Sequence, residues 1–434
     1  MMNLNKVGVV SLGCSKNRVD TETLLGYLKN WGFTIVNDEN EAEILIVNTC
    51  GFIDIAKEES INTILAMAQH KQGGNCKLLV ATGCLVKRYE NELKQELPEI
   101  DVFWGVKDYK MLAENIAKLA GKSECAYSPF NRIITTPQYS AYLRIADGCD
   151  NRCTYCAIPL IRGGRKSTPL EELIHEAKML TERGVREITV IAQDTSAYGI
   201  DIYGKPMLSE LLRKLSKIDR LDWIRVLYTY PNTVDEELID TIVQNDKITN
   251  YIDMPIQHIN DTVLKRMNRH GDRKHIEDVI KYMRKASDKF IIRSTLIVGF
   301  PGETDEQFEE LMKFLRDNPL DRIGAFAYSL EDGTPAAEFD GQIEDAVKQE
   351  RLSRLMRQQK EISAALNKKR IGDIVDVLIE GQNGNTALGR SYAEAPEVDA
   401  SIIIDSKGKK LSVGEFAKVK LTKASDYDMW GELI

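Results

Sequence analysis

Three cysteines stand close together in the run CDNRCTYC, at positions Cys149, Cys153 and Cys156, directly after the strand-like segment AYLRIADG. We refer to them as the loop triad. A cubane 4Fe-4S cluster contains four irons, so three cysteine ligands leave one iron open to a small molecule. Structural zinc instead prefers four closed ligands. The spacing C-x-x-x-C-x-x-C therefore favours a cluster with one open coordination position.

The alternative for the loop triad is a zinc ion with a fourth ligand from elsewhere in the chain. Cysteine and histidine together form many such sites. No histidine accompanies the triad at the spacing of a zinc motif. The five histidines of the chain are His70, His175, His258, His270 and His275.

Three further cysteines each close an apolar, strand-like run: Cys14 in KVGVVSLGC, Cys50 in AEILIVNTC and Cys84 in KLLVATGC. Helix-like stretches such as DTETLLGYLKNWG and AKEESINTILAMAQHK separate them, so the pattern predicts a parallel sheet with alternating helices. Ligands bind at the carboxyl edge of such sheets. We therefore expect these three residues, the strand-end triad, to meet and to form a second three-thiolate cluster site.

Glycines stand beside each member of the strand-end triad, at Gly13, Gly51 and Gly83. They suit a backbone that lies close to a bulky ligand. The alternative is that each cysteine is a small, buried, apolar residue, which is the usual state of a lone cysteine. We keep that interpretation for Cys76, which begins its strand, and for Cys125, which lies in a linker-like stretch.

Composition sets the class of protein. The chain has 434 residues, 43% of them hydrophobic and 29% charged, enough for two or three folded domains. A net charge of −8 gives no global attraction to polyphosphate. The N-terminal segment MMNLNKVGVVSLGC does not resemble a signal peptide, and no run is long enough to cross a bilayer. We expect a soluble, cytoplasmic protein, a setting in which clustered cysteines bind metal more often than they form disulfides.

After the loop triad the chain repeats strand and then helix. With AYLRIADGC in front, the strand candidates EITVIAQDT, WIRVLYTYP, YIDMPIQH, FIIRSTLIVGF and RIGAFAYSL give six βα-type units. Since six units are fewer than the eight of a closed barrel, we expect a partial, open barrel. Barrels of this kind carry active residues at the carboxyl ends of their strands. Those ends hold Gln193, Asp194, Tyr230, Gln257, His258, Gly299 and Glu331, each of which can equally be a turn residue or a satisfied polar group.

Two glycine-containing motifs were weighed as phosphate or cofactor loops. The run GGRKST, from Gly163 to Thr168, has Arg165 where a phosphate loop needs glycine before the lysine, so it indicates a turn. The run VGFPGETDEQF, with Gly299 and Gly302, predicts a strand-to-helix turn. That turn is either purely structural or a helix N-terminus near a bound cofactor.

The last part of the chain changes character. A charged helix is predicted from Gly341 to Arg370, and beyond Ile371 come the short strand candidates GDIVDVLIEG, TALGRSY, DASIIIDSKGKKL, EFAKVKLTKAS and DMWGELI. They predict a small antiparallel β-barrel. Such barrels often bind nucleic acid, but residues 368–434 hold ten Lys and Arg against eleven Asp and Glu. This net charge of −1 is a poor footprint for RNA.

The loop triad, with Tyr155 before its last cysteine, resembles the radical S-adenosylmethionine (SAM) superfamily. With the strand-end triad and the terminal barrel, nearly the whole chain resembles the methylthiotransferases. Their cluster domain, radical SAM barrel and TRAM domain would correspond to residues 1–125, 135–365 and 367–434. The segments SLGCSKNRVD, VNTCGFIDIAKEES, IADGCDNRCTYCAIPLIRG, AQDTSAYG and GRSYAEAPEVD resemble the RimO branch, which methylthiolates an aspartate of ribosomal protein S-twelve. They are less similar to the MiaB branch, which acts on a tRNA adenosine.

The resemblance implies two 4Fe-4S clusters and SAM. The loop triad would hold the cluster whose open iron chelates SAM, and the strand-end triad an auxiliary cluster involved in sulfur transfer. Gln193, Asp194 and the turn near Gly299 would contribute to the SAM pocket. The aspartate β-carbon offers no acidic proton to a base. A 5′-deoxyadenosyl radical from reductive cleavage of SAM would instead remove its hydrogen, and a second SAM would supply the methyl group.

The implied partners are ribosomal protein S-twelve or the small ribosomal subunit, a reductant protein and a sulfur donor, both unidentified. We expect a monomer without membrane contact, since no coiled-coil dimer seam is present. Two alternatives stay open. A tRNA adenosine methylthiotransferase would share both clusters and bind RNA in a salt-dependent way. A metal-stabilised protein that docks on the ribosome without catalysis would not cleave SAM.

Overall fold

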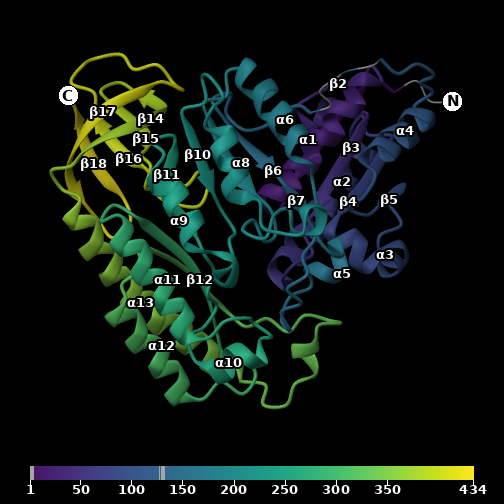
Figure 1. Ribbon diagram of the computed structural model, residues 1–434. Coiled ribbons are helices and arrows are strands. Elements are labelled where there is room, and N and C mark those ends of the chain that lie inside the picture. The colour runs from purple at the N-terminus through teal and green to yellow at the C-terminus, as the bar shows by residue number, and fades with distance from the viewer. Residues whose placement is uncertain (1–3, 127, 129–131) are drawn as a thin grey trace.

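The computed structural model describes residues 4–126, 128 and 132–434, which form three units in chain order (Figure 1). The N-terminal unit lies at the right of Figure 1, the central unit in the middle and lower left, and a small barrel at the upper left. Residues 1–3, where the expected N-terminal unit begins, lie outside the described residues. Within the described part of the chain, no helix is both long and apolar enough to cross a membrane.

The N-terminal unit is a five-stranded sheet with the order β2-β1-β3-β4-β5, and every pairing in it is parallel. Its strands are β1 (Lys6–Ser11), β2 (Thr34–Ile35), β3 (Ile44–Thr49), β4 (Leu78–Gly83) and β5 (Val102–Trp104). Its helices are α1 (Ser15–Asn30), η1 (Glu39–Glu41), α2 (Asp54–Gly73), α3 (Cys84–Glu96) and α4 (Tyr109–Leu119). Strands β3 and β4 are buried along their whole length, because α1 and α4 cover one face and α2 and α3 the other. The predicted parallel α/β unit is confirmed.

The central unit is built on a six-stranded parallel sheet with the order β13-β12-β11-β10-β9-β6. Its strands are β6 (Ser140–Arg144), β9 (Glu187–Ile191), β10 (Trp223–Val226), β11 (Ile248–Asp253), β12 (Ile291–Val298) and β13 (Arg322–Ala327). The edge strands β6 and β13 do not pair with each other, so the barrel is open, as predicted. A separate pair, β7 (Ala146–Asp147) and β8 (Lys166–Ser167), flanks the loop triad.

Helices cover the outside of this sheet, and the largest hydrophobic core lies between the two layers. The helices are α5 (Ile158–Arg162), α6 (Leu170–Glu182), α7 (Ile200–Tyr203), α8 (Leu208–Leu215), η2 (Pro231–Thr233), α9 (Glu236–Val243), α10 (Asp261–Arg266), α11 (Arg273–Ala286), α12 (Asp305–Asp317) and η3 (Pro335–Glu338). Thr304 caps α12 with Gln307 in a reciprocal capping box, so the helix that follows VGFPGET satisfies its own N-terminus. The long helices pack their apolar faces against the sheet, and this packing holds the strand ends where chemistry is expected.

A long helix, α13 (Asp345–Lys369), leads to the C-terminal barrel and begins a few residues later than the predicted Gly341. The barrel closes in the order β14-β15-β16-β18-β17. Its strands are β14 (Ile374–Asn383), β15 (Thr386–Arg390), β16 (Ile402–Asp405), β17 (Phe416–Ala424) and β18 (Met429–Leu433). The small barrel is confirmed, and its pairings are antiparallel except that β16 runs parallel to β18.

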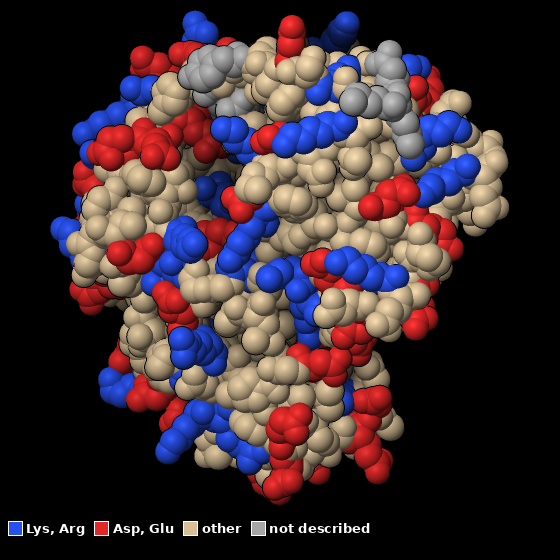
Figure 2. Space-filling model, turned by 90° about the vertical axis from the view of Figure 1, so that its right-hand side faces the viewer, with Lys and Arg blue, Asp and Glu red and all other residues tan. Residues whose placement is uncertain are grey.

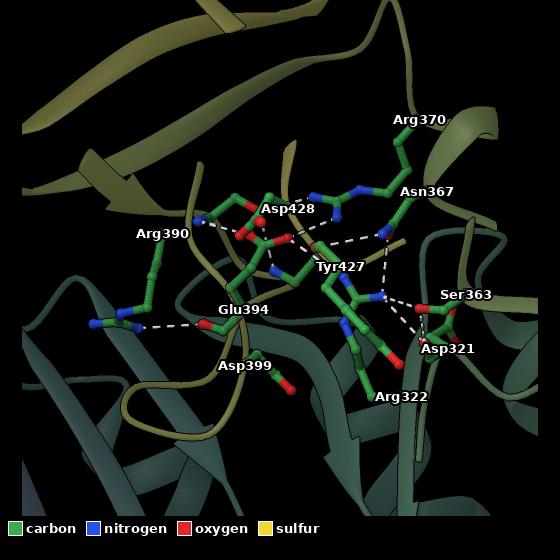
Figure 3. A network of polar contacts seen from close by, with 12 residues as sticks. Asp321, Arg322, Ser363, Asn367, Arg370, Arg390, Glu394, Asp399, Tyr427 and Asp428 are labelled. Atoms are coloured by element: carbon green, nitrogen blue, oxygen red, sulfur yellow. Dashed lines mark hydrogen bonds and ion pairs between the residues drawn. The ribbon is translucent and has the colours of Figure 1, made fainter. Parts of the chain in front are cut away.

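Buried ion pairs attach this barrel to the central unit (Figure 3). Glu394 accepts a hydrogen bond from Arg370 at 2.6 Å, and Arg390 reaches Glu187 of β9 at 2.6 Å. Burial alone would raise the pKa of Glu394, but Arg370 and Arg322 outweigh it and lower that pKa to about 2. The pKa of Glu187 is likewise lowered to about 2, because Arg390 and other arginine charge outweigh its burial. Both carboxylates are therefore ionised where they lie.

The segment 391–399 after β15, which we call the barrel loop, contacts all three units. Its Ala393 and Ala395 pack in a buried cluster with side chains of α1 and of strands β6 to β12. Glu397 accepts a hydrogen bond from Tyr142 of β6 at 2.8 Å and forms an ion pair with Arg18 of α1 at 3.1 Å. The C-terminal barrel is thus held in a fixed position relative to the N-terminal unit.

We expect Glu394→Gln to destabilise the protein by about 3 kcal/mol, because it leaves buried arginine charge without its partner. Differential scanning calorimetry measures the change. Glu432→Gln in the same barrel is the matched control: Glu432 pairs with Lys407 at 3.2 Å, and both side chains are more than two-fifths exposed. That exposed pair contributes less than about 1 kcal/mol. Equal shifts for the two variants would contradict the assignment of Glu394 as a docking residue.

Candidate functional site

The loop triad lies between β7 and α5, beside the carboxyl end of the open barrel. Cys153 is buried, whereas Cys149 and Cys156 are partly exposed. The backbone curls tightly here, since the Cys156 amide donates to the Cys153 carbonyl at 3.0 Å and the Cys149 amide to the Gly163 carbonyl at 3.1 Å. This curl directs three side chains from one short segment toward a common region.

Burial disfavours the ionised form of two thiols of the loop triad. Burial raises the pKa of Cys149 to about 11 and that of Cys156 to about 12. A metal ion favours the thiolate form of a thiol that it binds. Cys149 and Cys156 are therefore suited to be metal ligands, which lose their protons when a metal group binds. They are not suited to be free thiolate nucleophiles.

The strand-end triad occupies one edge of the N-terminal sheet. Cys14 caps α1 after β1, Cys50 follows β3, and Cys84 begins α3 after β4, so neighbouring strands carry the three residues. Contacts are close: a Cβ built on Gly13 would lie 3.0 Å from the Cys50 sulfur. Only a glycine permits this approach with the positive φ found at Gly13. The expected convergence of the three strand ends is therefore present.

The donor set of each triad, three cysteine sulfurs, is compatible with a 4Fe-4S cluster. Among the residues that the structure describes, no group of three His, Cys, Asp or Glu side chains is arranged to hold one metal ion. In a zinc site every sulfur binds the same ion at about 2.3 Å. In a cubane cluster each thiolate binds a different iron, so the sulfurs stand further apart. The chemistry of the donors, three thiolates in each set, matches the cluster.

Two glutamines at strand ends carry unpaired acceptors. Gln193, after β9, donates to Asp147 at 2.8 Å, while its Oε1 is buried without a partner among the described residues. Gln257, after β11, has a φ of +68° and a buried Oε1 in the same condition. Unpaired buried acceptors are costly, so they indicate polar groups that a ligand supplies. Asp194, next to Gln193, accepts from Asn151 of the loop triad segment at 2.8 Å.

Tyr230, at the end of β10, stacks against a buried arginine. The Arg269 guanidinium lies 4.1 Å from the centre of the Tyr230 ring and donates to the Tyr155 hydroxyl at 3.4 Å. Tyr155 belongs to the loop triad segment. Burial raises the pKa of Tyr230 to about 12, so its hydroxyl stays protonated. These contacts connect the second half of the barrel to the loop triad.

Gly299 and His258 lie in a packed corner under α13. His258 Nε2 and the Gly299 amide both contact the Glu303 carboxylate, at 3.0 and 2.5 Å, and Arg351 of α13 reaches it at 2.6 Å. A Cβ built on Gly299 would lie 2.4 Å from the Lys348 side chain, also of α13. The described surroundings of both residues are thus internal packing contacts.

Glu331, after β13, joins the central unit to the N-terminal unit. Its carboxylate binds Arg88 at 2.9 Å and Lys57 at 3.0 Å. Arg88 also donates to the carbonyl of Gly51, next to Cys50, at 2.7 Å. This clasp fixes the strand-end triad relative to the barrel.

A second clasp is Arg162, whose side chain is 1% exposed. It is six residues beyond Cys156 and donates to Asp20 at 2.8 Å and to Asn17 at 2.7 Å, both in α1. Its Nη2 lies 3.8 Å from the Cys84 sulfur. Burial opposes its charge, but Asp20 and other acidic groups outweigh burial and raise the pKa of Arg162. One buried cation therefore touches the strand-end triad from the segment that carries the loop triad.

Sequence reasoning did not single out Arg162 or Arg269. Arg162 lies within the segment IADGCDNRCTYCAIPLIRG, but its partners in α1 are more than a hundred residues away in the chain. Cys76 is buried, as predicted. The same prediction is wrong for Cys125, which is exposed because the segment after α4 lies on the surface.

Comparison with known proteins matches this architecture. Sequence models of the Radical SAM superfamily, the uncharacterized protein family UPF0004 and the TRAM domain match residues 143–315, 6–105 and 371–434. The chain is 50% identical over 440 aligned residues to the ribosomal protein uS12 methylthiotransferase RimO of Clostridium botulinum (strain Eklund 17B / Type B), covering 99% of this chain and 98% of that protein. The chain belongs to the RimO methylthiotransferase family. The protein of the same name from Clostridium perfringens (strain 13 / Type A) is 50% identical over 436 residues, 98% of this chain and 97% of that one.

Solved structures with the same fold are more distant than these RimO relatives. The radical SAM methyltransferase TsrM from Kitasatospora setae superposes with a TM-score of 0.57 at 14% identity, covering 77% of this chain and 74% of that chain. The cobalamin-dependent radical SAM enzyme OxsB gives 0.53 at 12% identity, with 82% and 56% covered. These likenesses support the radical SAM fold alone.

We expect Arg162→Met to destabilise the cluster-free protein by about 3 kcal/mol. The variant removes the positive charge that pairs with the buried Asp20 and weakens the contact between α1 and α5. Calorimetry measures the loss, and hydrogen exchange of α1 and α5 locates it. Arg273→Met serves as control, since Arg273 is 36% exposed and pairs with the partly exposed Glu277 and Glu310. If hydrogen exchange in α1 stayed at the wild-type level, Arg162 would not be the residue that couples the units.

Proposed function

We propose that this protein attaches a methylthio group to an aspartate of ribosomal protein uS12, the S-twelve protein, by radical SAM chemistry. The observation that carries the proposal is 50% identity over nearly the full length of relatives named for that activity. One cysteine triad at neighbouring strand ends and a second in the segment between β7 and α5 agree with it. The aspartate itself comes from the resemblance of the sequence segments to the RimO branch.

The radical SAM family implies a 4Fe-4S cluster and SAM. We assign that cluster to the loop triad and a second, auxiliary cluster to the strand-end triad. The bound groups supply the radical that opens a carbon–hydrogen bond too weakly acidic for a base. Three thiolates in each set, with the buried charge of Arg162 beside Cys84, support the second cluster.

The chain itself has three tasks in this mechanism: to hold, to orient and to exclude water. The Asn151 to Asp194 contact ties the loop triad to β9. The free carbonyl oxygens of Gln193 and Gln257 are acceptors for polar groups of SAM. Buried aromatic and arginine side chains around Tyr230 keep bulk water from the reacting centre, which limits side reactions.

We also retain the expected units 1–125, 135–365 and 367–434, of which the last two are joined by the continuous helix α13. Basic and acidic side chains are interspersed over the face shown in Figure 2, and residues 368–434, which include the C-terminal barrel, have a net charge of −1. Both features support a protein substrate over tRNA. A monomeric, cytoplasmic enzyme with an external reductant and sulfur donor completes the proposal.

To test it, anaerobically reconstituted protein is incubated with SAM and reductant, and S-twelve protein and tRNA are offered in parallel. We expect mass spectrometry to detect a methylthio increment on one aspartate of S-twelve. An increment on tRNA alone would overturn the substrate while keeping the chemistry. SAM cleavage without either product would overturn both substrates.

Two cysteine variants separate the roles of the triads. We expect Cys153→Ala to abolish 5′-deoxyadenosine formation, because two thiolates do not hold the site-open cluster. Cys50→Ala is expected to keep some SAM cleavage and to lose methylthio transfer. Cys125→Ala, at an exposed cysteine outside both triads, is the control and keeps both activities. If both triad variants folded but lost both activities, the division of roles would be wrong.

A further inference from the structure

Lys16 is a buried lysine on the seam between the N-terminal and central units. It lies in the first turn of α1, two residues after Cys14, and is 7% exposed. Its Nζ stands 2.8 Å from the centre of the Tyr228 ring, which belongs to the segment after β10. The charge of Lys16 interacts with Cys14 on one side and with Asp253, at the end of β11, on the other. It therefore lies where the strand-end triad faces the mouth of the barrel.

Among the described residues, no acidic side chain lies within 4.0 Å of the Lys16 ammonium. The nearest acids are already engaged. Asp253 binds Arg293 at 2.9 Å and accepts from the Tyr228 amide at 3.1 Å. Asp147, whose negative charge also interacts with Lys16, binds Arg162 at 3.0 Å. Within the described part of the chain, the Tyr228 ring thus lies against this buried ammonium and no carboxylate pairs with it.

Helix α1 makes this position less favourable still. The N-terminal end of a helix carries partial positive charge, which favours acidic side chains and disfavours cations. The first turn of α1 contains no acidic residue, and Cys14 at its N-cap makes no capping hydrogen bond. A buried, unpaired cation is costly, so the site lacks an anion.

We propose that Lys16 binds the side-chain carboxylate of the substrate aspartate and so determines specificity for an acidic residue of a protein. The inference rests on the proposed function and names the contact that selects its substrate. The Tyr228 hydroxyl and the Ser15 hydroxyl lie 3.4 Å from each other beside Lys16 and offer further donors. A nucleobase carries no anion for this site.

The chemistry of aspartate explains why this contact matters. Its carboxylate carbon is bonded directly to the β-carbon that loses hydrogen and gains sulfur. A cation that fixes the carboxylate therefore fixes the reacting carbon one bond away. Since Lys16 comes from α1 and Tyr228 from the barrel, that carbon would be held between the two triads, within reach of hydrogen removal at one and sulfur transfer at the other.

The experiment measures binding of reconstituted enzyme to two forms of unmodified S-twelve. One form keeps the target aspartate, and the other has asparagine in its place. Wild-type enzyme is expected to prefer aspartate by roughly 10- to 100-fold, the range for hydrogen bonds to a charged group. Lys16→Met should abolish this preference, and its KM for S-twelve should rise by a similar factor. Lys16→Arg should restore part of the preference. Lys94→Met, at a half-exposed lysine of α3, is the control and should behave as wild type.

The other possible ligands of Lys16 each predict a different result. If Lys16 serves the auxiliary cluster, Lys16→Met changes iron content or the electron paramagnetic resonance spectrum while the preference for aspartate persists. If it binds a sulfide donor, only the dependence on added sulfide changes. Either result overturns the inference. If Lys16→Met does not fold, Tyr228→Phe and Lys16→Arg still report on the preference. Failure of wild-type enzyme to modify S-twelve would overturn the proposed function instead.

Discussion

Neutralisation of the buried Arg162 guanidinium is the constraint on which the arrangement of the two triads depends. A charge at 1% exposure is tolerated only when acidic partners surround it, and these come from two units: Asp20 from α1 and Asp147 from β7. Therefore α1 and the loop triad segment cannot separate without exposing or stranding charge. Because Cys84 lies at the same guanidinium, both triads are fixed by one local requirement.

Buried ion pairs also hold the other contacts between the units. Glu331 is 3% exposed and binds cations of the N-terminal unit, and Glu187 is fully buried between arginines of β10 and β15. Buried pairs of this kind contribute little net stability compared with apolar contacts, but they are strongly orientation-dependent. Their role here is to specify one relative position of three units. A radical reaction needs that precision, because its reactive carbon must be within reach of two separate centres.

The sequence was sufficient for the architecture and for the positions of the two sets of cysteines, because these depend on local patterns. Apolar runs ending in cysteine, alternating with amphipathic helices, predict a parallel sheet with thiols at one edge. The seams were beyond such reasoning, since Arg162, Glu331 and Glu187 find partners far away in the chain. His258 and Gly299 illustrate the reverse difficulty: they occupy strand ends, as predicted, but their described contacts are with Glu303 and α13. Strand-end position alone does not distinguish a ligand from a packing residue.

The beginning of α1 gathers most of these requirements into about two helical turns. Within it Cys14 offers a thiol, Lys16 a cation, and Asn17 and Asp20 the partners of Arg162. Lys16 meets the barrel at Tyr228, and the contacts of Asn17 and Asp20 with Arg162 anchor the same helix to α5. The Lys16 site therefore exists only in the docked arrangement, since its aromatic wall, Tyr228, belongs to the other unit. A substrate carboxylate that enters this seam adds the missing anion, so substrate binding and the docking of the two units favour each other.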